Sequence, residues 1–128
     1  MRLALPLLLA AFAAAPSLLH AQGVGGAIRG KIPAAQAGEF IGRRATVCGT
    51  VASARFAENS EGQPTFLFVG AAFPNHPFSI RIWGRDRAKF SVDPVSLVGK
   101  AVCVTGEIGR ANNRPEIVAR SPDDLDVT

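Results

Sequence analysis

The stretch Lys100 to Ile108, with the sequence KAVCVTGEI, alternates apolar residues with polar or small ones. Valine, valine, glycine and isoleucine occupy the even positions from 102 to 108, and Cys, Thr and Glu the odd positions from 103 to 107. Because successive side chains of a strand point to opposite faces, this pattern predicts a long strand with one face in a core. Gly106 stands in the middle of the apolar stripe, where a residue without Cβ permits a sharp bend.

A second stretch, Thr46 to Val51, repeats this alternation with Gly49 in its apolar stripe. Three shorter strands are predicted by apolar or alternating runs at 65–69, 78–83 and 116–119. A short helix is expected over 34–41, after Pro33, and helical turns over 85–90 and 93–97. Long first and fourth strands, with a helical insert between strands 3 and 4, are typical of the OB-fold, a five-stranded Greek-key barrel. We therefore expect an all-β OB-fold with a short N-terminal helix, a small open sandwich being the alternative.

The first residues predict export rather than a part of the fold. Arg2 precedes an uncharged run rich in Leu and Ala, which ends near Ala21. This pattern predicts a signal peptide over 1–21 and a periplasmic or secreted protein. A membrane anchor is the alternative, but Pro6 and Pro16 interrupt the run, and no later segment could cross a bilayer. The glycine-rich stretch 22–31 predicts a flexible leader, which leaves 32–128 as one OB-fold domain.

The two cysteines predict a disulfide. Cys48 precedes Gly49 by one residue and Cys103 precedes Gly106 by three, so both cysteines lie opposite the apolar stripe of their strand. In an OB-fold these two strands pair antiparallel, which makes the thiols cross-strand neighbours in an oxidising compartment. A redox role is disfavoured because there is no C-x-x-C spacing. Two cysteines and two histidines indicate no metal cluster, and we expect no cofactor.

Nothing in the sequence has the pattern of a catalytic centre, so we expect no enzyme. His76 lies in a proline-flanked loop with no paired nucleophile, which is typical of a solvated residue. The acidic residues show no metal-ligand spacing and are expected to be solvated surface charges. The acidic residues expected to be solvated in this way are Glu58, Glu61, Asp86, Asp93, Glu107 and Glu116.

Binding of a polyanion has more support than catalysis. Residues 22–120 contain 13 basic and 7 acidic residues, a balance that favours polyanionic partners. On the third strand Arg81 and Trp83 lie opposite the apolar face, and Phe66 and Phe68 on the second strand could complete a stacking platform for single-stranded DNA or RNA. Core packing is the alternative for both phenylalanines, and packing under the following helical turn is the alternative for Trp83.

Two loops that flank the binding face of OB-folds add polar and basic residues. Arg55 lies in the expected first loop, and Arg110, Asn112 and Arg114 lie in the expected loop between strands 4 and 5. The predicted nucleic-acid site therefore consists of Arg55, Phe66, Phe68, Arg81, Trp83, Arg110, Asn112 and Arg114. The competing hypothesis is a module for interaction with another exported protein, or for envelope stability, that binds no nucleic acid.

Five motifs in this order carry a family resemblance: VCGTV at 47–51, PTFL at 64–67, IWGRDRAKF at 82–90, GKAVCVTGEI at 99–108 and PEI at 115–117. Together they resemble the small secreted bacterial OB-fold nucleic-acid-binding-domain proteins, with their tRNA-anticodon-like OB-fold, over residues 32–127. The resemblance implies a five-stranded barrel, a cystine joining strands 1 and 4, no catalytic centre and nucleic-acid binding. This chain departs from the family pattern at Phe68, where a polar residue is usual, and at Ala111, where a tyrosine is usual.

Overall fold

The computed structural model describes residues 3–4 and 26–128. Apart from residues 3 and 4, the signal peptide expected over 1–21 lies outside the described residues. In the described part of the expected leader, the Ile28 N–H donates a hydrogen bond to the Arg44 carbonyl at 2.8 Å. Lys31 already begins a strand, so regular structure starts ahead of the predicted boundary at residue 32. The described part contains no helix long and apolar enough to cross a membrane.

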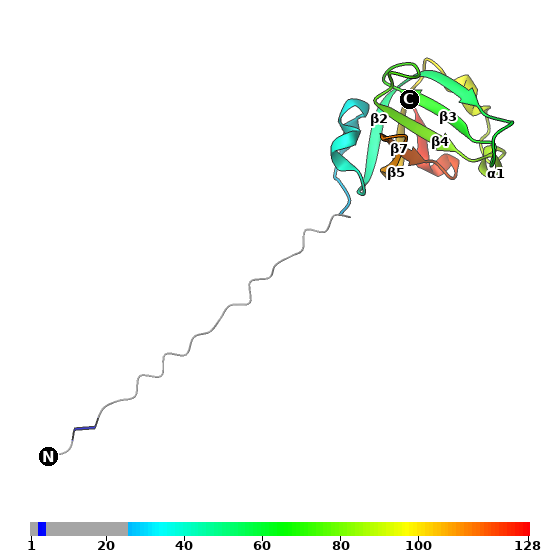
Figure 1. Ribbon diagram of the computed structural model, residues 1–128. Coiled ribbons are helices and arrows are strands. Elements are labelled where there is room, and N and C mark those ends of the chain that lie inside the picture. Colours follow the sequence, from blue (N-terminus) through cyan, green and yellow to red (C-terminus); the bar gives the residue numbers. More distant parts are fainter. Residues whose placement is uncertain (1–2, 5–25) are drawn as a thin grey trace.

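The described chain is mostly strand, with short helical turns between strands (Figure 1). In chain order the elements are β1 (Lys31–Pro33), η1 (Ala34–Phe40), β2 (Arg44–Phe56), β3 (Thr65–Val69), β4 (Phe78–Ile82), α1 (Gly84–Arg87), η2 (Pro94–Leu97), β5 (Ala101–Glu107), β6 (Gly109–Ala111), β7 (Arg114–Val118), η3 (Pro122–Asp124) and β8 (Leu125–Val127). The five predicted strands correspond to β2, β3, β4, β5 and β7. The helix predicted after Pro33 is a 3-10 helix, η1.

The strands are hydrogen-bonded in the order β6-β7-β4-β3-β2-β5-β8, with β1 added beside β2. The first half of β2 pairs antiparallel with β5 and its second half with β3, and the pairing changes at a register shift between Val51 and Ser53. β4 and β7 pair in parallel. Ile108 links β5 directly to β6. This continuous stretch of chain therefore contributes strands near both ends of the strand order. This arrangement confirms the predicted all-β, OB-like fold. Across the described residues the eight strands form a sheet that is not closed, rather than the expected five-stranded barrel.

Close strand packing explains the two glycines in the long strands. A Cβ on Gly49 would lie 2.6 Å from Val69 Cγ1, and one on Gly106 would lie 2.7 Å from Ile117 Cγ2. Both distances are far below the ordinary van der Waals contact distance. Val69 and Ile117 can therefore pack this closely only because residues 49 and 106 have no side chain. The fully buried core around them includes Leu67, Phe78, Ile80, Ile82, Val104 and Ile117.

Cys48 and Cys103 are register partners in the β2–β5 ladder. They form a disulfide with an S–S distance of 2.08 Å and a sequence separation of 55. This confirms the pairing expected from their common position relative to the glycines. The disulfide therefore joins the first and fourth predicted strands.

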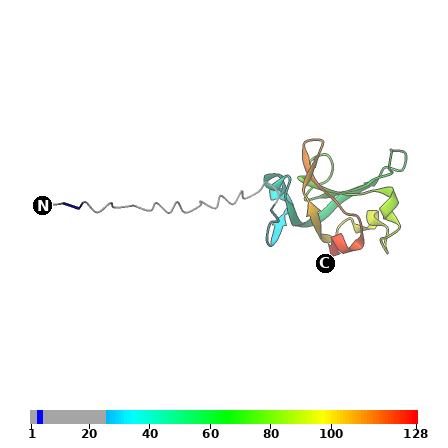
Figure 2. The same cartoon turned by 90° about the horizontal axis from the view of Figure 1, so that it is seen from below.

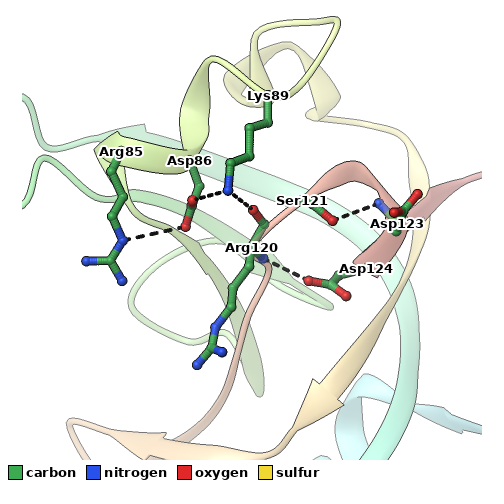
Figure 3. Close-up of polar contacts among 7 residues, drawn as sticks. All are labelled: Arg85, Asp86, Lys89, Arg120, Ser121, Asp123 and Asp124. Carbon is green, nitrogen blue, oxygen red and sulfur yellow. Dashed lines mark hydrogen bonds and ion pairs between the residues drawn. The ribbon is translucent and has the colours of Figure 1, made fainter.

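The C-terminal segment is held by a polar cluster that the sequence did not indicate (Figure 3). Asp86 of α1 is buried, and its Oδ1 accepts a hydrogen bond from Lys89 Nζ at 2.7 Å. Lys89 Nζ also reaches the carbonyl oxygen of Arg120 at 3.4 Å, and the Arg120 N–H donates to Asp124 Oδ2 at 2.9 Å. The expectation that Asp86 is a solvated surface charge is therefore wrong: its buried carboxylate holds Lys89, and Lys89 contacts the chain that leads into β8.

Candidate nucleic-acid interface

A groove of about 470 Å³ lies on the outer face of β3, β4 and β7. Strand register places its side chains: Phe66 faces Arg55 on one side and Arg81 on the other, and Ser79 faces Phe68. Residues directly opposite in a ladder share a face, and the alternate residues of these strands fill the core. We call this the aromatic groove; it is lined by Arg55, Phe66, Phe68, Phe73, Pro74, His76, Ser79, Arg81, Ala111, Asn112, Arg114 and Glu116.

Four rings form a continuous cluster along the groove. Phe68 lies at its centre, with ring centroids at 6.1 Å from Phe66, 5.2 Å from Phe73 and 4.5 Å from His76. Phe68 itself is only 7% exposed, whereas Phe73 is 61% exposed. The ring most available to a ligand is therefore that of Phe73, which is not among the predicted site residues, and the buried Phe68 ring packs against it. Phe66 is therefore partly exposed and Phe68 is buried, as core packing predicts, although neither belongs to the main cluster of core residues.

Arg114 is held by the loop between β3 and β4. Its Nη1 donates to the His76 carbonyl oxygen at 3.0 Å and lies 3.2 Å from His76 Nδ1. Figure 2 shows the β6–β7 hairpin (orange) beside a green loop, as these contacts require. The hairpin turns at Asn112 and Asn113, both with positive φ, as a tight two-residue turn demands. The stretch 109–115 is thus a hairpin, rather than the loop expected there.

His76 is 8% exposed, so the expectation of a solvated loop residue is wrong. Burial, and secondarily the positive charge of Arg114, lower the pKa of His76 below its ordinary value of 6.5. The ring is therefore neutral at pH 7, and Nδ1 can accept a hydrogen bond when Nε2 carries the proton.

Arg81 is engaged within the protein. Its Nε lies 3.1 Å from Glu116 Oε2 in an ion pair, and its Cζ lies 5.0 Å from the ring centroid of Phe66 and 4.8 Å from that of Trp83. Glu116 is buried, which corrects its assignment as a solvated charge. Burial raises the pKa of Glu116, an effect that the charge of Arg81 and its hydrogen bond only partly offset. Much of the Arg81 charge is therefore compensated before any ligand arrives.

The structure brings together six of the eight predicted site residues in the aromatic groove: Arg55, Phe66, Phe68, Arg81, Asn112 and Arg114. The other two lie elsewhere. Trp83 lines a separate depression, and a Cβ on Gly62 would lie 2.8 Å from its ring. Arg110 lines a second groove, over β5 and β7.

Two cations of the aromatic groove are available to an anion. Among the described residues, neither Arg55 nor Arg114 takes part in an ion pair. Arg55 is exposed and Arg114 half-buried. No group of three or more His, Cys, Asp or Glu side chains in residues 26–128 is placed to hold a metal ion. The chemistry of the groove is therefore that of an aromatic surface with two unpaired guanidinium groups.

No protein-family model matches the chain, and no curated protein matches it. Among solved structures it matches a crystal structure of a putative aspartyl-tRNA synthetase from Leishmania major Friedlin, with a TM-score of 0.47 and 12% identity over 84% of this chain. The match covers 24% of that protein's length. A similarity this remote carries no inference about a ligand, and the OB-like assignment rests on strand order and register.

Proposed function

We propose that this protein is an exported, non-catalytic OB-fold module that binds single-stranded DNA or RNA in the aromatic groove with little sequence preference. The observation that supports it best is the exposed Phe73 ring lying in the same groove as Arg55 and Arg114. Single-stranded nucleic acid is bound by such combinations, in which bases stack on aromatic rings and cations follow the phosphates. The family resemblance adds to this support.

The groove favours stacking over base-specific readout. Every base has a π-face, so a ring such as Phe73 accepts any of them and contributes about 1–3 kcal/mol per stacked base. Arginine side chains bind phosphates, which are common to all sequences. We therefore expect affinity to depend on strand length and salt more than on sequence. Export is proposed on the N-terminal pattern and on the Cys48–Cys103 disulfide, which suits an oxidising compartment.

The test is a fluorescence titration with labelled single-stranded DNA and RNA at several salt concentrations, with inorganic polyphosphate as the polyanion control. Phe73→Ala should lower oligonucleotide affinity about fivefold to 150-fold and leave polyphosphate affinity nearly unchanged. Val92→Ala is the matched control, because Val92 is also an exposed apolar residue but lies outside the aromatic groove. Absence of wild-type binding to both nucleic acids at low salt would overturn the proposal and favour the protein-interaction hypothesis.

A further inference from the structure

We propose that His76 is a positioning residue for Arg114: it fixes the guanidinium by accepting hydrogen bonds and so prepares Arg114 to bind a phosphate of the nucleic acid. This role rests on the proposed function of the aromatic groove. It differs from a stacking or catalytic role, because His76 acts through Arg114.

The contacts of Arg114 single out one end of its guanidinium. Nη1 has two acceptors nearby, and both belong to His76: the carbonyl oxygen at 3.0 Å and Nδ1 at 3.2 Å. Nε and Nη2 donate no hydrogen bond to any residue that the structure describes. These are two neighbouring nitrogens of a planar fork, which can take a phosphate bidentately. Arg114 is therefore anchored by one nitrogen and available through the other two.

The acceptor is itself held in place. The centroid of the His76 ring lies 4.5 Å from that of Phe68 and 5.8 Å from that of Phe73, and His76 is buried. Its lowered pKa supports a neutral ring with a lone pair on Nδ1. A protonated ring would carry hydrogen on both nitrogens and could not accept from Arg114. Burial, ring packing and protonation state thus all favour an acceptor facing the arginine.

Arg55 provides an internal comparison. It is exposed, and none of the side-chain hydrogen bonds or ion pairs among the described residues includes it. Ordering such a free side chain on binding costs conformational entropy, whereas an anchored side chain has less freedom to lose. Arg114 should therefore contribute more to affinity than Arg55, although both carry the same charge.

Two variants of His76 separate its acceptor from its ring. His76→Phe keeps an aromatic ring but removes the side-chain acceptor, and His76→Asn keeps a side-chain acceptor but removes the ring. If His76 positions Arg114, His76→Phe should weaken binding of a labelled single-stranded oligonucleotide about twofold to tenfold. The loss should disappear in an Arg114→Ala background and persist in a Phe73→Ala background. His76→Asn should then retain more of the coupling to Arg114 than His76→Phe does.

The opposite pattern overturns the inference. Wild-type affinity in His76→Phe, or an equal loss with and without Arg114, would show that His76 does not act through the arginine. A loss that couples to Phe73 instead would show that the ring only supports the stacking surface. Circular dichroism must show that each variant is folded.

An NMR titration of His76 tests the contact without a ligand and without changing the histidine. Arg114→Ala should raise the His76 pKa towards 6.5, because a nearby positive charge is removed; an unchanged value would overturn the inference. If the proposed function itself is wrong, the wild type will bind no oligonucleotide, and this result differs from a failure of the His76 inference alone. A wild type that binds and a His76→Phe variant that binds equally well would overturn only the role of His76.

Discussion

The Nε of Arg81 lies 3.1 Å from Oε2 of Glu116 on the neighbouring strand, and both side chains are largely shielded from solvent. The sequence predicted that Arg81 binds nucleic acid, but in the structure its guanidinium forms an ion pair with Glu116. Arg81→Met should therefore destabilise the protein by about 1–3 kcal/mol, because it leaves a buried carboxylate without its partner. Urea denaturation measures this change.

Salt dependence separates Arg81 from Arg114. Arg114→Ala should lower the slope of log affinity against log salt by about one unit, because one phosphate contact is lost. Arg81→Met should change the slope less, since the charge of Arg81 is already compensated by Glu116. Equal changes of slope in the two variants would show that Arg81 leaves Glu116 to bind phosphate.

Glu116 also predicts a pH dependence of stability. Its pKa is raised above the ordinary value of 4.5 in the folded protein, so the folded state binds a proton more readily than the unfolded chain. Stability from this group is therefore greatest below pH 4.5 and is lost as pH rises through the raised pKa. The free energy of unfolding of the wild type minus that of Glu116→Gln should fall as pH rises from 4.5 through the raised pKa. A difference that does not change with pH would contradict the prediction.

The contribution of His76 to stability depends on pH in the opposite direction. Its pKa is lowered in the folded protein, so the unfolded chain takes up its proton first as pH falls below 6.5. The stabilising contribution is present above this value and is lost as pH falls through the lowered pKa. The free energy of unfolding of the wild type minus that of His76→Asn should therefore rise with pH, whereas the corresponding difference for Glu116→Gln should fall.

Trp83 and Phe73 should respond in opposite ways to truncation. Trp83 packs against Gly62 and Arg81 but does not itself line the aromatic groove, so Trp83→Ala should lower thermal stability while leaving oligonucleotide affinity within about twofold. Phe73 is exposed within the groove, so its truncation should weaken binding with little effect on melting temperature. A strong loss of affinity in folded Trp83→Ala would extend the binding surface to that side.

Local periodicity explains which parts of this fold could be predicted. The two-residue alternation around Gly49 and Gly106 fixed the strands, their inward faces and the common side of the cysteines. It could not find Phe73 or His76 as site residues, because their loop reaches the groove only through contacts with Arg114 and Phe68, which are distant in sequence. The sequence FPNHP at 73–77, which places Phe73 and His76 next to prolines, was the available signal.

Charged residues show the same limit. Asp86 stands between two arginines in the sequence and Glu116 between Pro115 and Ile117, yet each is buried against a cation. Glu116 meets Arg81 only when β4 and β7 pair in parallel, a non-local event. The short β8 was missed because three residues carry too little periodicity, and it is defined by pairing with β5.

The disulfide should account for a large share of the stability. Cys48 and Cys103 are separated by 55 residues, and the chain-entropy model gives about 4 kcal/mol for closing such a loop. The variant Cys48→Ala/Cys103→Ala should lose about this amount in urea denaturation, and a reductant should destabilise only the wild type. Equal stability of the oxidised protein and the double variant would contradict the prediction.

Gly49 offers a test of how closely the strands pack. Gly49→Ala should destabilise the protein by about 1–3 kcal/mol, because its Cβ would overlap Val69 Cγ1 at 2.6 Å. Val69→Ala removes that methyl group and leaves space, so the double variant should lose less than the sum of the two single losses. Gly38→Ala is the matched control, since a Cβ there meets nothing within 4 Å. Additive losses would show that Gly49 is needed for backbone bending rather than for close approach, because removal of Val69 Cγ1 would then bring no relief.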